Sequence, residues 1–141
     1  MNSLPDLQNW LDEVTRAYAT ADREVIRPYI LVPLTIVNPR GTVVHEDEAG
    51  VDRYLDYYLD SGKLHGVTDA IRLAKDLVPL GEGRVLATYE SHYLRGATYV
   101  TQPYMSSAEL VLNDGRWKIA KINTEVEPVQ WRSIDTLRAR G

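Results

Sequence analysis

The stretch TIVNPRGTVVHEDEAGVDRYLDYY, residues 35–58, decides the fold because two kinds of secondary structure meet in it. Two β-rich runs flank the tetrapeptide Asn-Pro-Arg-Gly at 38–41, and these residue types favour a tight turn. A helical pattern follows directly. Four residues share one helix face at spacings i, i+3, i+4 and i+7: Val51, Tyr54, Leu55 and Tyr58. The stretch therefore predicts a hairpin followed by an amphipathic helix over about residues 46–60, ended by Ser61-Gly62.

Upstream of the hairpin, the pattern predicts two further helices. Apolar residues at spacings of three and four predict the first helix, with Ser3 as its N-cap. They are Leu4, Leu7, Leu11, Val14, Tyr18 and Ala21. The segment ADREVIRPY predicts a short second helix that ends at Pro28. The strand ILVPLTIV follows, in which Pro33 marks an edge or a bulge.

Downstream of residue 65 the chain is rich in β-formers. Four long runs are separated by turn sequences, and Asn113-Asp114-Gly115 is a strong hairpin signal. We therefore predict an α+β fold, a cone-shaped, curved, mostly antiparallel sheet wrapped around three N-terminal helical segments. Residues 1–141 form a single domain in this interpretation, with 127–141 as a C-terminal tail in which Trp131 and Ile134 anchor a short helix. The mouth of such a cone is a natural pocket.

Composition narrows the classes of function. The 16 Lys and Arg against 20 Asp and Glu give a net charge of −4, which argues against nucleic acid or an anionic membrane as the main partner. The sequence has no cysteine, and His45, His65 and His92 show no metal-ligand spacing, so we expect no metal and no cofactor. No apolar run approaches the roughly 20 residues of a membrane span, and a cytoplasmic protein is expected. Nine tyrosines and no phenylalanine suit a partly wet cavity or an interface.

In the order of its predicted helices and strands, the chain resembles the nuclear transport factor 2-like superfamily, and its SnoaL-like branch in particular. The likeness spans about residues 4–126 and depends on the stretch 35–58 and on the closing LNDGRWKIAKIN at 112–123. The resemblance implies the cone fold and its pocket. It implies no single activity, because members include polyketide cyclases, steroid isomerases, dehydratases, epoxide hydrolases and many non-catalytic binding domains.

The residues of this sequence do not support one activity of the superfamily, that of the steroid isomerases. The resemblance to ketosteroid isomerases places Asn38 where those enzymes have a general-base aspartate, and an amide takes up no proton at neutral pH. It places Val14 and Ala108 where they have oxyanion donors. Steroid-isomerase chemistry is therefore not expected. Two interpretations of Asn38 remain, that it forms the turn or that it hydrogen-bonds a ligand.

The run RVLATYESHYL contains the strongest candidate chemistry. Its residues alternate between the two faces of the sheet. When the run is aligned with the isomerase-like pattern, the face with Thr88, Glu90 and His92 is expected to point into the cone. A carboxylate beside an imidazole makes a usable acid–base pair in an apolar cavity, as in the dehydratases and cyclases that the chain resembles. Two alternatives remain, a non-catalytic pocket role and a position on the outer face as solvated charges or dimer contacts.

Other candidate ligand-binding residues come from helices and from later strands. Tyr18, Tyr54 and Tyr58 lie on helices that would roof the sheet, and Tyr104 and Thr124 lie on the last two strands. On the final strand, alternation predicts Ala120, Ile122 and Thr124 inward. It predicts Trp117, Ile119, Lys121 and Asn123 outward, on a surface suited to a dimer.

Three hypotheses of function follow. The first is a pocket protein for a small apolar or aromatic molecule, either binding only or acting as a cofactor-free lyase, isomerase or hydrolase through Glu90 and His92. The second is a non-catalytic binding or assembly module that forms a homodimer through the open sheet face. The third is an accessory subunit resembling the small subunits of ring-hydroxylating dioxygenases, which requires a large partner.

Overall fold

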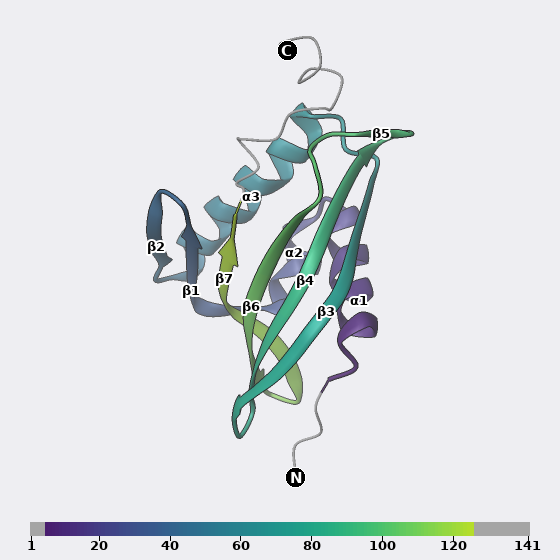
Figure 1. Ribbon diagram of the computed structural model, residues 1–141. Coiled ribbons are helices and arrows are strands. Elements are labelled where there is room, and N and C mark those ends of the chain that lie inside the picture. The colour runs from purple at the N-terminus through teal and green to yellow at the C-terminus, as the bar shows by residue number, and fades with distance from the viewer. Residues whose placement is uncertain (1–4, 126–141) are drawn as a thin grey trace.

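The computed structural model describes residues 5–125, and the predicted α+β architecture is confirmed (Figure 1). The helices are α1 (Leu7–Ala19), α2 (Arg23–Ile26), the 3₁₀ helix η1 (Arg27–Tyr29) and α3 (Glu48–Leu64). The strands are β1 (Ile30–Asn38), β2 (Gly41–His45), β3 (Asp69–Gly81), β4 (Arg84–Arg95), β5 (Thr98–Tyr99), β6 (Tyr104–Asn113) and β7 (Arg116–Thr124).

Within the described residues the strands form one seven-stranded, curved sheet in the order β2-β1-β7-β6-β4-β3, and β5 pairs with β4. The pairing is antiparallel except between β1 and β7, which run parallel. In Figure 1 helix α1 lies along β3 on one side of the sheet, and α3 lies beside the β1–β2 hairpin. The helices therefore cover one face and leave the other face uncovered by any described element.

The two long helices begin and end differently from the sequence prediction. Helix α1 has Asp6 as its N-cap, whose carboxylate accepts a hydrogen bond from Asn9 N at 3.2 Å. The predicted cap, Ser3, lies outside the described residues. Helix α3 continues past Gly62 to Leu64, because the left-handed residue that ends it is Gly66, with φ +67°.

Two interruptions in strand pairing change which residues face the helices. The pairing of β1 with β7 shifts between Ile30 and Thr35, so Pro33 lies in an irregularity as predicted. In β7, Ala120 is an unpaired extra residue between Ile119 and Lys121. The bulge turns Ile119 into the core at 5% exposure, and its predicted outward orientation is therefore wrong.

One predicted strand is divided in the structure, and the predicted tail lies outside the described residues. The long strand predicted from residue 98 is divided into β5 and β6, separated by residues 100–103. The tail at 127–141, with Trp131 and Ile134, lies outside the described residues, so the single-domain assignment of 1–141 stays a prediction. Across 5–125, no helix combines the length and the apolar character needed to cross a bilayer.

The core lies between α1, α3 and the covered face of the sheet. Helix α1 contributes one buried stripe, which is Leu7, Trp10, Leu11, Val14 and Ala17. Helix α3 contributes Val51 and Leu55, both fully buried, to the same core cluster as Leu34 of β1 and Leu110 of β6. This packing places the aromatic side chains of both helices over the middle of the sheet.

The two leucines of α3 allow a matched test of this core. Leu55 is 0% exposed and Leu64 is 84% exposed. We expect Leu55→Ala to lower the free energy of unfolding by about 2–5 kcal/mol, because it leaves a cavity in the core. Leu64→Ala should change it by about 0.5 kcal/mol or less. Urea unfolding followed by circular dichroism measures both, and equal losses would contradict the burial assigned to α3.

Candidate ligand-binding cavity

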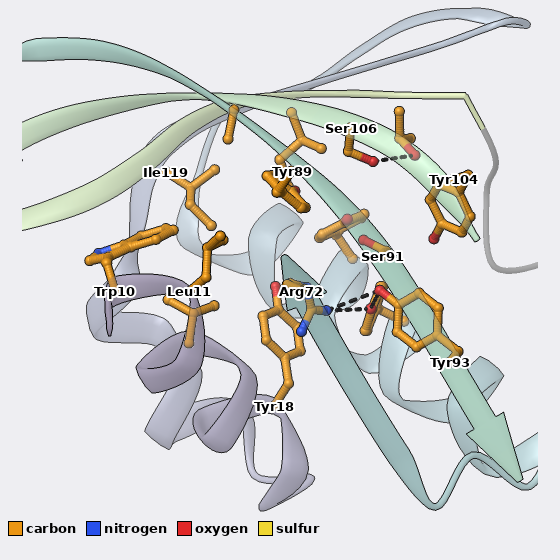
Figure 2. A pocket seen from close by; sticks show the side chains of 16 residues that line it. Trp10, Leu11, Tyr18, Arg72, Tyr89, Ser91, Tyr93, Tyr104, Ser106 and Ile119 are labelled. Carbon is orange, nitrogen blue, oxygen red and sulfur yellow. Dashed lines mark hydrogen bonds between the residues drawn. The ribbon is translucent and has the colours of Figure 1, made fainter. Parts of the chain in front are cut away.

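A cavity of about 60 Å³ lies between the covered face of the sheet and helices α1 and α3 (Figure 2). Its apolar end is formed by Trp10, Leu11, Val14, Ala108, Ile119 and Ile122. Its polar end is formed by Tyr18, Tyr54, Tyr58, Arg72, Tyr89, Ser91, Tyr93, Tyr104, Ser106 and Thr124. Below, these sixteen residues are called the inner cavity.

Strand alternation positions the sheet side of the inner cavity. On β4 the buried face carries Val85, Ala87, Tyr89, Ser91 and Tyr93. The antiparallel register sets Tyr89 opposite Ser106 of β6 and sets Ser91 opposite Arg72 of β3. Side chains from three neighbouring strands therefore converge on one place.

Arg72 is the central polar residue of the cavity and is only 7% exposed. Its Nη1 donates to Thr15 Oγ1 at 2.9 Å, and its Nη2 donates to the hydroxyl oxygens of Tyr58 at 2.9 Å and Tyr93 at 3.0 Å. Its guanidinium carbon lies 5.2 Å from the ring centroid of Tyr18 and 5.6 Å from that of Tyr93, within cation–π range. Figure 2 shows the guanidinium between these rings.

The charge of Arg72 is not neutralised by any residue in the range 5–125, because no carboxylate there lies within ion-pair distance of it. Burial opposes the charged form, but the surrounding tyrosine oxygens counter it, and the pKa of Arg72 stays above its ordinary value. A buried charge is costly unless it is paired. Arg27, by contrast, forms ion pairs with Glu48 and Asp52.

Several hydroxyls of the inner cavity also lack protein partners. Those of Tyr18, Tyr54, Tyr89 and Ser91 form no hydrogen bond with another described residue. Burial raises the pKa of Tyr18, Tyr54 and Tyr58, although the charge of Arg72 acts in the opposite sense. Polar groups in a protein interior normally have a partner in the protein, water or a ligand, so these hydroxyls have hydrogen-bonding capacity left for a molecule in the cavity.

Helix α1 also fixes the backbone that bears Arg72. Strand β3 is at the edge of the sheet. The side-chain amide of Gln8 donates to Arg72 O at 2.8 Å and accepts from Ala74 N at 2.8 Å. This amide therefore pairs with the strand edge on either side of residue 73 and orients Arg72 toward the cavity.

The predicted acid–base pair lies elsewhere. Glu90 and His92 are on the opposite face of β4 from Tyr89 and Ser91, so their predicted orientation into the cone is wrong. The two are in contact, with His92 Nε2 donating to Glu90 Oε1 at 2.8 Å. His92 Nδ1 lies 3.0 Å from the hydroxyl of Tyr99. The physical reason is that the middle of the strand buries the face without charged residues and leaves the carboxylate and imidazole partly in solvent.

Thr88 and Asn38 are also outside the inner cavity. Thr88 shares the outer face of β4 with Glu90, so its expected inward orientation is wrong for the same reason. Asn38 ends β1 at the hairpin, where its Oδ1 accepts from Arg40 N at 2.8 Å. This is the turn geometry that asparagine favours, and the turn interpretation describes its position.

Five predicted residues do line the inner cavity: Tyr18, Tyr54, Tyr58, Tyr104 and Thr124. Ligand binding by them stays a prediction. Val14 and Ala108, at the donor positions suggested by the resemblance, line it too but have no polar side-chain atoms.

Sequence reasoning missed Arg72, Tyr89, Ser91 and Tyr93. A usable signal existed for β4, because between its terminal arginines only the face with Glu90 carries a residue charged at neutral pH.

The described residues contain no group of three or more His, Cys, Asp or Glu that is arranged to hold a metal. The described polar lining of the inner cavity consists of one guanidinium, hydroxyls and aromatic rings. Such groups offer hydrogen bonds, charge and apolar contact.

Comparisons with known proteins support the fold. No family model and no curated protein matches the sequence. A nuclear transport factor 2-like protein of unknown function from Shewanella oneidensis MR-1 matches 86% of this chain and 97% of its own, with a TM-score of 0.68 and 13% identity.

Two further solved structures agree. A domain of unknown function with a cystatin-like fold from Nostoc punctiforme PCC 73102 has a TM-score of 0.66 and 8% identity, over 86% of this chain and 75% of that one. A nuclear transport factor 2-like protein of unknown function from Shewanella baltica OS155 has a TM-score of 0.54 and 15% identity, over 89% and 99%. The chain has the nuclear transport factor 2-like fold.

The buried tyrosines of the inner cavity predict how the stability of the protein changes at high pH. Burial raises the pKa of Tyr89 from 10.0 to about 12, against the opposing charge of Arg72. Between these values the folded protein retains a proton that the unfolded chain has lost, so the free energy of unfolding falls as pH rises. We expect Tyr89→Phe to reduce this fall by about 2 kcal/mol between pH 10 and 12. Urea unfolding across that range measures the slope.

The same two proteins compared at pH 7 provide the control, since tyrosine is protonated in both states there. Their difference at pH 7 reports only the packing and solvation of the hydroxyl. An identical slope in both proteins above pH 10 would show that Tyr89 ionises at its ordinary pKa.

Proposed function

We propose that the protein binds a small organic molecule with an apolar or aromatic body in the inner cavity. The observation that carries the proposal is that cavity hydroxyls without a described partner surround a buried, unneutralised guanidinium. Apolar walls with a few convergent polar groups are typical of small-molecule sites. The protein would bind its ligand as a SnoaL-like member of the fold.

The residues of the inner cavity favour binding over proton-transfer catalysis. Its described lining includes no carboxylate and no imidazole. Phenols are protonated at neutral pH, and burial raises the pKa of Tyr18, Tyr54 and Tyr89 further, so they serve as hydrogen-bond donors and not as bases. A lyase or isomerase would need its base from outside this lining. The accessory-subunit hypothesis and the cytoplasmic location stay predictions.

We propose second that two copies pair through the outer face of β3 and β4. Ile71 and Leu73 are 48% and 37% exposed there. The register sets them directly opposite His92 and Glu90, which already bond to each other. Apolar side chains beside internally paired polar groups suit the centre of an interface between like surfaces. In this role Glu90 and His92 are dimer contacts, the alternative that the sequence left open.

Filling the inner cavity tests the first proposal. Ser91 points into the cavity, and Ser107 of β6 lies on the opposite face of the sheet. We expect Ser91→Leu to abolish the rise in melting temperature that wild type shows with a panel of monocyclic aromatic acids, amides and alcohols. Ser107→Leu should keep that rise, because it adds the same side chain outside the cavity. Ala108→Val is a second, milder way of filling the cavity.

A panel member that stabilises wild type and Ser91→Leu equally binds outside the inner cavity. A panel that stabilises neither Ser107→Leu nor wild type contradicts the proposed function. Ligand at one hundred times its Kd adds about 2.7 kcal/mol to stability, which makes a thermal shift readily measurable.

Sedimentation velocity tests the pairing of copies. We expect wild type to sediment as a dimer and Leu73→Lys to sediment as a monomer, because the substitution buries a charge at the centre of the interface. Val43→Lys is the matched control, since Val43 is 51% exposed but lies on β2 at the other edge of the sheet. A monomeric wild type would refute the pairing.

A further inference from the structure

The geometry points to an anionic ligand, a small organic carboxylate whose charged group is bound by Arg72. This inference goes beyond the proposed function, because the ligand that it describes lies in a second hollow that shares Arg72 with the inner cavity. The first observation is that the guanidinium of Arg72 has no negatively charged partner among the described residues. Hydroxyls of Thr15, Tyr58 and Tyr93 satisfy three of the five N–H groups of the guanidinium, but they carry no charge.

Arg72 borders two hollows and not one. Besides the inner cavity it lines a larger groove of about 340 Å³, which lies between the last turns of α1 and α3 and the start of β3. Tyr18, Tyr58 and Tyr93 also belong to both linings and form the wall between them. Below, this second hollow is called the outer groove. A ligand in the outer groove reaches the guanidinium from the solvent side.

The remaining donors of Arg72 are available to such a ligand. Among the described residues, its Nε–H and one Nη1–H have no acceptor. A carboxylate that accepts from either of these groups would neutralise the charge and satisfy one more donor of the guanidinium. Hydrogen bonds between ionised partners are roughly twice as strong as those between neutral groups.

The charge of the outer groove favours an anion as well. Its lining includes Arg16, Lys63 and Arg72, against the single acidic side chain of Asp69. The protein as a whole is acidic, with a net charge of −4, so this local excess of positive charge opposes the global balance. A cleft with one sign of charge raises the local concentration of ligands of the opposite sign.

The rest of the lining specifies an apolar body on the anion. Leu59, Val67 and Ala70 line the outer groove together with Tyr18 and Tyr58. Inorganic phosphate would leave these apolar surfaces without a partner. A carboxylate attached to an aromatic or aliphatic body would contact both the guanidinium and the apolar lining.

Calorimetric titration with charged and neutral probes of one shape tests the inference. Benzoate and phenylacetate are compared with benzamide and phenylacetamide, and inorganic phosphate is titrated as the small anion. We expect wild type to bind at least one carboxylate at least tenfold more tightly than the matching amide. Phosphate should bind more weakly than that carboxylate.

Variants assign the effect to Arg72. We expect Arg72→Met to weaken carboxylate binding at least tenfold and to leave amide binding within about threefold, with Arg72→Gln as a second substitution should the first not fold. Arg84→Gln is the control, because Arg84 is exposed and lies outside both hollows. Lys63→Gln should slow association at low salt and approach wild-type behaviour at high salt.

Each outcome separates this inference from the proposed function. Amides that bind as tightly as carboxylates, phosphate that binds as tightly as either, or Arg72→Met that binds carboxylate normally would overturn the anionic ligand and leave the binding cavity intact. No binding of any carboxylate up to about 1 mM also overturns it. The proposed function is contradicted only if benzamide and phenylacetamide also fail to bind.

Discussion

The buried guanidinium of Arg72 is the interaction on which the interior of this protein depends. It joins β3 to α1 through Thr15, to α3 through Tyr58 and to β4 through Tyr93. Four elements therefore meet at one charged group, and α1 is the one most distant from β3 in the sequence. Neutral oxygens and ring faces surround it, and no described carboxylate lies within ion-pair distance of it, so its positive charge is not neutralised there. The charge of Arg27, by contrast, is neutralised by its ion pair with Asp52.

The surroundings of Arg72 explain how a strand at the sheet edge holds a buried charge. Ala70 and Ala74 flank it on the same face of β3, opposite Tyr93 and Tyr89 of β4. Small residues on one strand leave room for large rings on the next. The amide of Gln8 satisfies the backbone on both sides of residue 73. Strand edge, helix and side chain are therefore fixed together, which preorganises the polar end of the cavity.

The two faces of β4 have different chemistry and different uses. The face with Tyr89 and Ser91 contributes hydroxyls to the cavity, and the face with Glu90 and His92 contributes an ionisable pair to the uncovered side of the sheet. Period-2 alternation separates the two sets in the sequence but does not say which set is buried. The cost of burying a carboxylate decides it, and that cost outweighs the catalytic appeal of the pair.

The sequence by itself determined the order of elements, the α+β class, the Asn-Pro-Arg-Gly turn and the helix tyrosines that line the cavity, because local periodicity and turn chemistry encode these features. Only the tertiary structure decided the burial of Arg72. In the sequence it stands between Ile71 and Leu73, yet those two residues are exposed and Arg72 is buried. Strand register decides these orientations, as the bulge at Ala120 decides that of Ile119. Register and bulges depend on contacts between distant segments, which no local pattern contains.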